Sequence, residues 1–434
     1  MTAMRTNPPG AETKILNQIV CPHCWERYPV DEIVWVSEHA ELRGDGKLGA
    51  DFPRRFLPSR FTPEGDAIDS KGRVCHQLAC PKCHLTLPRS MLEMEPLFIS
   101  VLGTPGSGKS YFLTAAMWKL REILPHKFGV AFADADLLSN QVLVRAEEDL
   151  FLNPDADELV WLGGLIRKTD AAVANNELYD SVTYGSHSVS YLRPYLFTAS
   201  PTDHHPSAER GTVRGRVLCL YDNAGEHFLP GQDTAASPVT RHLALSRAVL
   251  FLYDPTQDPR FRDACQRAGL KPPKVERDRV FRQETTLNEA AARARKHAGL
   301  VGGSPPDRVL IVVVSKYDTW APLLDAGDGG DPWWTPASGG IAGLDVDKIE
   351  ARSVALRQLL MQLSPEIVSA AEGFTPEVIY MPASALGEAT EIDPATGNLG
   401  IRPRQVAPFG VSVPFLYALH RTAPGLIPRL KRKR

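Results

Sequence analysis

Unbroken apolar runs recur along the chain after residue 95 and alternate with segments of helical periodicity. Each run is apolar at nearly every position, which is typical of strands in a parallel sheet that is covered on both faces. Between the runs, apolar residues recur with the spacing of an amphipathic helix. This alternation predicts a doubly wound α/β domain. We expect strands at 97–103, 216–222, 248–254, 308–315 and 377–384, and helices after 110 and at 257–268, 275–297, 346–363 and 414–420.

Composition and charge indicate a folded globular chain. Its 434 residues, 43% of them hydrophobic, are enough for two or three domains. The 49 Lys and Arg residues nearly balance the 51 Asp and Glu residues, so no global field would draw the chain to nucleic acid or anionic lipid. The N-terminal residues lack a signal-peptide pattern, and apolar runs such as 309–314 are too short to span a bilayer. We therefore expect a cytoplasmic protein without an integral membrane segment.

Four of the seven cysteines form two knuckles, CPHC and CPKC. Two thiolates separated by two residues can bind one tetrahedral ion, because the tight turn aims both sulfurs at one point. The pattern predicts a zinc ribbon with four thiolates and no open position for a catalytic water. The Gly-, Pro- and charge-rich stretch between the knuckles is expected to be an inserted loop. The expected ligands are Cys21, Cys24, Cys80 and Cys83, with Cys75, His23, His76 and His84 as alternatives.

A glycine-rich loop, VLGTPGSGKSYF, follows the first expected strand and precedes a helix. It satisfies the phosphate-loop pattern G-x-x-x-x-G-K-[ST] in the strand-to-helix context that the pattern requires. Glycines allow the backbone N–H groups to surround a phosphate, and the helix N-terminus adds partial positive charge. We expect Lys109 to reach the β- and γ-phosphates, and Ser110 to bind Mg²⁺. The candidate nucleotide-binding residues here are Gly103, Gly106, Ser107, Gly108, Lys109, Ser110 and Tyr111.

Three later phrases, LYDNAGE, VVVSKYD and MPASALG, each follow an expected strand. In the first, Asp222 could hold Mg²⁺ through water, and the N–H of Gly225 could meet the γ-phosphate. In the second, the Asp318 carboxylate could accept both N–H donors of a guanine edge, with the Lys316 stem along the base. Together the phrases favour GTP as the nucleotide. The additional candidate residues are Ser315 from the second phrase and Ser384, Ala385 and Leu386 from the third.

With these motifs, residues 95–421 resemble the translation-factor-related class of P-loop GTPases, which contains the Ras-like proteins. The resemblance implies a three-layer α/β/α fold with a mostly parallel sheet and a molecular switch that hydrolyses GTP with Mg²⁺. It also implies catalytic roles for Lys109 and for Glu226, which stands where many Ras-like proteins have a water-orienting glutamine. A negatively charged side chain there should slow hydrolysis, or His227 or a partner should orient the water instead. Thr183 is the candidate for the threonine of the first switch.

A CxxC ribbon joined to such an enlarged domain is similar to the bacterial double-GTPase families. That resemblance implies a signalling or defence role with a protein partner, which could be a second GTPase. The zinc ribbon could also bind nucleic acid, although it lacks a basic and aromatic stripe.

The organisation expected from the sequence has four parts. They are a disordered N-terminus at 1–16, a zinc ribbon with its inserted loop at 17–94, a GTPase domain with insertions at 95–425 and a basic tail at 426–434. Two other functions are open: a P-loop ATPase or kinase, and a scaffold that holds a nucleotide without turning it over. The Glu226 substitution is the feature that motivates the scaffold alternative.

Overall fold

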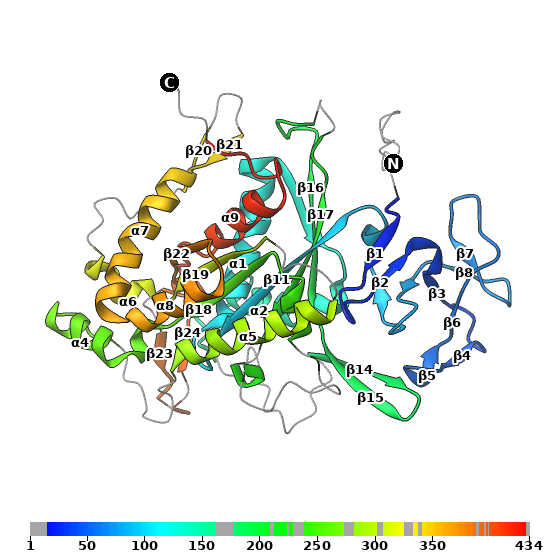
Figure 1. Cartoon of the computed structure of the whole chain (residues 1–434), viewed down its shortest axis with the longest axis horizontal. Helices are drawn as coiled ribbons and strands as arrows, with labels where there is room; N and C mark the ends of the chain where they lie inside the picture. The colour runs from blue at the N-terminus through cyan, green and yellow to red at the C-terminus, as the bar shows by residue number, and fades with distance from the viewer. Residues whose placement is uncertain are drawn as a thin grey trace. The chain divides into compact units, whose positions relative to one another are not determined.

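The computed structural model divides into two compact units, residues 1–96 and 97–434 (Figure 1). It describes residues 15–161, 178–208, 212–223, 225–228, 238, 240–272, 282–301, 307–324, 333–336, 341–387, 390–394, 396–397 and 399–430. Residues 1–14 of the expected disordered N-terminus at 1–16, and residues 431–434 of the expected tail, lie outside these ranges. Within them, no helix is long and apolar enough to cross a bilayer.

The N-terminal unit consists of short antiparallel strands. A four-stranded sheet has the order β10-β9-β3-β6, and three further hairpins pair β1 with β2, β4 with β5 and β7 with β8. The stretch 43–73, which the sequence predicts to be an inserted loop, contains strands β4 to β7. The strands are β1 (Gln18–Val20), β2 (Arg27–Pro29), β3 (Val34–Val36), β4 (Arg43–Asp45), β5 (Gly49–Pro53), β6 (Arg55–Phe56), β7 (Ala67–Ile68), β8 (Val74–Cys75), β9 (Leu78–Ala79) and β10 (Thr86–Leu87).

The larger unit is built on a seven-stranded sheet with the order β12-β16-β17-β11-β18-β19-β22. Strands β11, β18, β19 and β22 are parallel, whereas β12, β16 and β17 form antiparallel pairs. The parallel strands therefore end at one edge of the sheet. The strands are β11 (Glu95–Gly103), β12 (Val130–Asp134), β16 (Tyr195–Pro201), β17 (Arg216–Asp222), β18 (Ala248–Tyr253), β19 (Val309–Val314) and β22 (Val378–Pro382).

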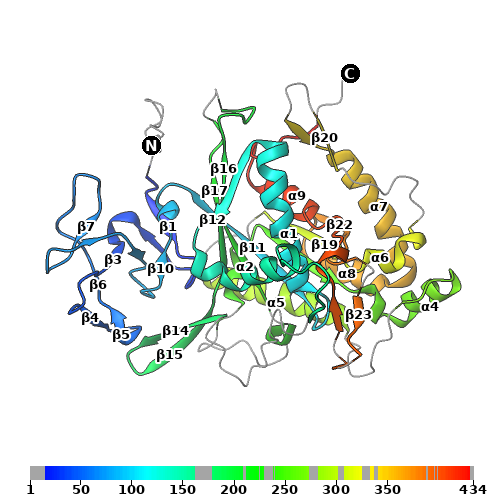
Figure 2. The same cartoon turned by 180° about the vertical axis from the view of Figure 1, so that it is seen from behind.

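Helices cover both faces of this sheet (Figures 1 and 2). Along β18, Leu250 and Leu252 belong to a core with α1 and α9, while Val249 and Phe251 belong to a second core with α4, α5, α7 and α8. The strands are apolar throughout because both of their faces are buried. The helices are α1 (Lys109–Ile123), α2 (Leu137–Phe151), α4 (Pro259–Arg267), α5 (Gln283–Val301), α6 (Tyr317–Trp320), α7 (Val346–Leu363), α8 (Pro365–Phe374) and α9 (Val413–Thr422).

Smaller strand groups lie outside the main sheet. The hairpin of β14 (Tyr179–Tyr184) and β15 (His187–Leu192) extends away from it as an arm (Figure 2). A three-stranded sheet joins β13 (Val160–Trp161), β24 (Leu399–Ile401) and β23 (Thr390–Ile392), and β20 (Trp334–Pro336) pairs with β21 (Ala342–Leu344).

Several element boundaries differ from the sequence expectation. Helix α5 begins at Gln283, and residues 275–281 of the expected helix lie outside the described ranges. Helices α2 and α8 were not expected at all. At the expected tail, Leu426 and Ile427 are fully buried, and the chain pairs with β21 as far as Leu430. Burial of these apolar side chains holds the start of this segment against the larger unit.

A partly buried ion-pair group joins α1, α2 and β12. Arg121 donates from Nε to Glu147 at 3.0 Å and from both terminal nitrogens to Asp134 at 2.8 and 2.9 Å. Burial raises the pKa of Glu147 to about 7, although Arg121 opposes the shift. The folded state therefore binds this proton more tightly than the unfolded chain does.

This shift predicts a pH-dependent stability. Between the ordinary Glu pKa and about 7, the Glu147 contribution to the free energy of unfolding should fall as the pH rises, by up to about 3 kcal/mol, because the native state must then bury a charge. Glu147→Gln should therefore gain stability relative to the wild type between pH 5 and pH 8, measured by denaturant unfolding. Glu148→Gln, at an exposed neighbouring position, is the control. A stability difference for Glu147→Gln that does not change with pH would contradict the prediction.

Candidate functional site

Each cysteine knuckle in the N-terminal unit forms the turn of a hairpin. Cys21 and Cys24 lie between β1 and β2, and Cys80 and Cys83 lie between β9 and β10. The residue after each knuckle, Trp25 or His84, has a left-handed φ of 61° or 64°. Its N–H donates to the carbonyl of the first cysteine, at 3.0 Å and 2.9 Å respectively. The two knuckles thus repeat one backbone geometry.

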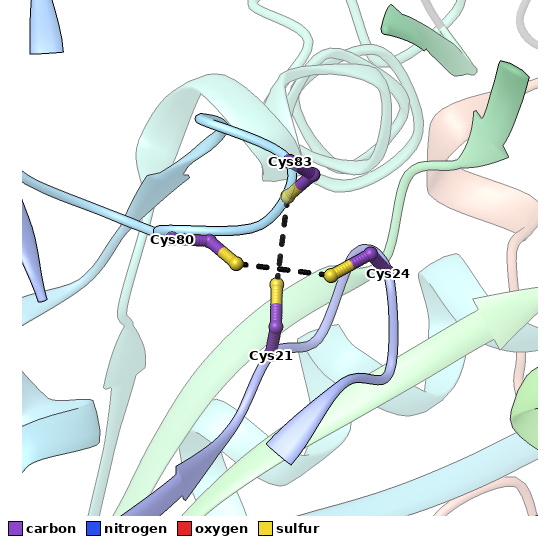
Figure 3. Close-up of side chains that lie close together, drawn as sticks. All are labelled: Cys21, Cys24, Cys80 and Cys83. Carbon is purple, nitrogen blue, oxygen red and sulfur yellow. Dashed lines mark hydrogen bonds between the residues drawn. The ribbon is translucent and has the colours of Figure 1, made fainter. Parts of the chain in front are cut away.

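The four sulfur atoms converge on one point (Figure 3). All of them lie within 4.8 Å of one another, with Cys21 to Cys83 at 3.8 Å and Cys24 to Cys80 at 3.7 Å. A tetrahedral zinc ion with Zn–S bonds of about 2.3 Å requires S···S separations of about 3.8 Å. The N–H of His23 and that of Lys82 each point to a cysteine sulfur at 3.3 Å. The four cysteines can therefore bind a metal ion such as zinc.

Burial disfavours the thiolate form of these cysteines unless a cation is bound. The side chains of all four cysteines are buried, and burial raises the pKa of the Cys21 and Cys83 thiols well above the usual range. A divalent ion would supply the charge compensation that the buried thiolates lack.

The alternative ligands have other partners. Cys75 Sγ contacts Asp69, His84 Nδ1 pairs with Asp45, His76 Nδ1 pairs with Asp66, and His23 Nε2 contacts the Thr86 carbonyl. In the part of the chain that the structure describes, the potential metal-binding group consists of the four knuckle cysteines.

The glycine-rich loop of the larger unit connects β11 to α1. Gly103, Gly106 and Gly108 have φ values of 154°, 76° and 87°, which disfavour side chains. A Cβ on Gly103 would lie 2.8 Å from both the Leu252 carbonyl oxygen and Ser107 Oγ. The loop conformation thus requires glycine. Directly after the loop, Tyr111 on α1 packs toward Leu150 and Ile401.

Polar groups cluster at this loop. Lys109 Nζ donates to the carbonyls of Gly103 at 2.8 Å and Thr104 at 3.2 Å. Ser110 Oγ donates to Asp222 Oδ2 at 3.0 Å, and burial raises the pKa of Asp222. Among the described residues, Ser107 Oγ and Asp222 Oδ1 are buried without a hydrogen-bond partner. Buried polar atoms of this kind are rare without a ligand or water.

The structure describes only some of the switch residues that the sequence predicts. Gly225 lies against the loop, because a Cβ there would be 2.5 Å from Pro105 Cδ. The side chains of Glu226 and His227 lie outside the described part of the structure. Thr183 occupies an exposed position in β14, paired with Ser188 of β15.

The two remaining loops come together at the carboxyl edge of the sheet. Ser384 Oγ donates to Asp318, and Tyr317 N donates to the Ala383 carbonyl at 3.1 Å. Ser315 Oγ donates to the Tyr253 carbonyl at 3.1 Å. Of the other two residues expected in the last loop, Ala385 packs against the core that contains α1 and α9, and Leu386 packs against Leu150 and Ile401.

Asp254, for which the sequence suggested no role, connects these loops. It is fully buried directly after β18, and its Oδ2 pairs with Lys316 Nζ at 2.6 Å. Its Oδ2 also accepts from Gln257, whose amide nitrogen reaches the Pro105 carbonyl at 3.5 Å. The sequence signal that could have identified Asp254 is an acidic residue directly after an apolar run, in the phrase FLYDPT.

Comparison with known proteins found a distant relative. The chain is 28% identical over 346 residues to a Mycolicibacterium smegmatis protein named as the ESX-1 scaffolding and assembly protein SaeC. The match covers 76% of this chain and 76% of the relative. No protein-family profile matches the chain.

This finding corrects the functional expectation. The expected membership of the translation-factor-related GTPases, the double-GTPase assignment and the role as a GTP-hydrolysing enzyme and switch are wrong, because the relative is a scaffolding and assembly protein. The physical reason for the error is that a phosphate-loop motif specifies a backbone conformation and not a reaction.

Proposed function

We propose that this protein is a scaffolding and assembly protein that binds protein partners. The observation that carries this proposal is the 28% identity to the scaffolding relative across most of both chains. A match of this extent includes much of the larger unit, so it does not rest on the cysteine knuckles alone. The ESX-1 assembly named for the relative is the setting that we propose for this chain.

We propose further that the N-terminal unit holds structural zinc. The spacing of the four sulfurs supports this metal, and a closed four-thiolate site serves stability rather than catalysis. None of the seven cysteines is paired in a disulfide, which supports a reducing, cytoplasmic location.

We propose that the larger unit has the three-layer P-loop fold and binds a nucleotide. The glycine backbone, Lys109 and the unpartnered Ser107 Oγ support a phosphate ligand, and Ser110 with Asp222 supports Mg²⁺. Asp318 supports guanine as the base. In this proposal GTP is a bound structural ligand that the scaffold does not turn over.

Direct binding to assembly components tests the scaffolding role. The purified full chain should bind at least one ESX-1 component with a Kd of about 10 µM or tighter, measured by calorimetry, as expected for a specific interface. SaeC from M. smegmatis is the positive control for each component. If SaeC binds and this chain binds none of the same components, the proposed function is wrong.

Nucleotide binding is tested by calorimetry with GTP, GDP and ATP in Mg²⁺. Lys109→Ala should weaken GTP binding by about 10-fold or more, because a charge-assisted hydrogen bond is lost. Asp318→Ala should remove the preference for GTP over ATP, whereas Glu350→Ala, on the exposed side of α7, should change neither. Equal binding of ATP and GTP by the wild type would contradict the proposed base, and absence of binding would contradict the proposed ligand.

A further inference from the structure

The segment between the two knuckles contacts the second knuckle through charged side chains. Lys47 Nζ donates to the carbonyls of Pro81 at 3.1 Å and Lys82 at 2.5 Å. Arg55 Nε donates to the carbonyl of His84 at 2.9 Å. Two cations of the β4–β6 region therefore hold three carbonyls of the backbone that carries Cys80 and Cys83.

Asp45 organises both of these cations. Its side chain is 1% exposed, and Oδ1 accepts from the N–H of Lys47 at 2.9 Å and of Leu48 at 3.1 Å. Oδ2 accepts from the N–H of Arg55 at 3.3 Å and pairs with His84 Nδ1 at 2.8 Å. One carboxylate thus connects the β4–β5 turn, the start of β6 and the residue directly after Cys83.

These contacts place positive charge near the cysteine cluster. Four thiolates around a divalent ion carry a net charge of −2, and burying that charge is costly unless nearby cations and hydrogen bonds offset it. Lys47 and Arg55 supply two positive charges against the one negative charge of Asp45, and Arg55 interacts electrostatically with Cys83 as well as with Asp45. Groups that surround the ligands of a metal commonly affect its affinity as well as ligand orientation.

We propose that the segment 43–56 is a brace for the metal site, with Lys47 and Arg55 as positioning residues. They offset part of the charge of the metal-bound cluster and orient the Cys80–Cys83 knuckle through its carbonyls, while Asp45 holds them in place. This inference rests on the proposed zinc site. Because the brace and the metal stabilise each other, removing the metal should loosen the segment.

Zinc affinity of the full chain tests the brace, measured by competition with a chromophoric chelator. Lys47→Met and Arg55→Met should each weaken zinc binding by about 10-fold to 100-fold, which is typical for groups around metal ligands. Lys47→Arg should retain most of the affinity because it keeps the charge. Arg43→Met is the matched control, because Arg43 lies in the same hairpin but donates to the Asp51 carbonyl.

Two further measurements separate the possible failures. The visible spectrum of the cobalt-loaded variants should keep its tetrahedral four-thiolate bands, which shows that the ligand set is intact. Hydrogen exchange across 43–56 should accelerate when zinc is removed from the wild type. Unchanged affinity in both methionine variants overturns the brace, as does an equal loss in Lys47→Arg. Absence of metal binding by the wild type would instead overturn the zinc site itself.

Discussion

Replacing Cys21 or Cys80 with serine is expected to abolish stoichiometric zinc binding and unfold the N-terminal unit. Both side chains are fully buried in the cluster, so each substitution removes a ligand and leaves three buried thiols without a complete site. Structural zinc contributes about 10–16 kcal/mol of binding free energy in small zinc domains, which is more than the net stability of most domains. The zinc content, measured by mass spectrometry, should fall from one ion per chain to near zero.

Cys75→Ser is the control for these two variants. Cys75 is also buried in the N-terminal unit, but its sulfur contacts Asp69 and lies outside the cluster. This variant should keep one zinc ion per chain and its far-ultraviolet circular dichroism. Full zinc occupancy in Cys21→Ser or Cys80→Ser would show that the cluster is not the metal site.

Trp320→Ala is expected to destabilise the larger unit by about 3–5 kcal/mol, as is usual for removing a buried large aromatic side chain. Trp320 is fully buried and packs edge-on against Phe261 and Tyr317, with ring centroids 5.7 and 4.9 Å away. Its Nε1 donates to the Ser315 carbonyl at 2.8 Å. The substitution therefore leaves a cavity and removes the hydrogen bond that holds the segment carrying Lys316 and Asp318.

Denaturant unfolding of the larger unit measures this loss. Trp320→Phe should cost less than Trp320→Ala, because it keeps most of the ring contacts and loses mainly the N–H donor. Trp161→Ala is the matched control, since Trp161 is 52% exposed and its removal should change the free energy of unfolding by no more than about 0.5 kcal/mol. A loss below about 1 kcal/mol in Trp320→Ala would contradict the packing described here.

The zinc ligands were predictable because the signal is local. The turn in CPHC or CPKC places two sulfurs together whatever the rest of the chain does, and the same geometry recurs at both knuckles. The brace was not predictable, because Lys47 and Arg55 lie more than 20 residues before Cys80 in a stretch rich in turn-forming residues. Only the pairing of β3 with β6 and β9 brings that stretch onto the second knuckle.

The main strands were also visible as continuous apolar runs, since burial on both faces requires them. Helix α2 was missed, although Asp136 caps it by accepting from the Leu138 N–H at 3.0 Å. Helix α8 was missed because Ser364 separates it from α7 by a single residue.

By itself, the sequence determined the cysteine pairs, the glycine-rich loop and most buried strands, because each depends on residues that are close in the chain. Only the tertiary structure decided which side chains surround them. It placed Asp254 between Lys316 and Gln257, and Asp45 between His84 and the two cations of the brace. These contacts join residues far apart in sequence, and local propensity carries no information about such pairings.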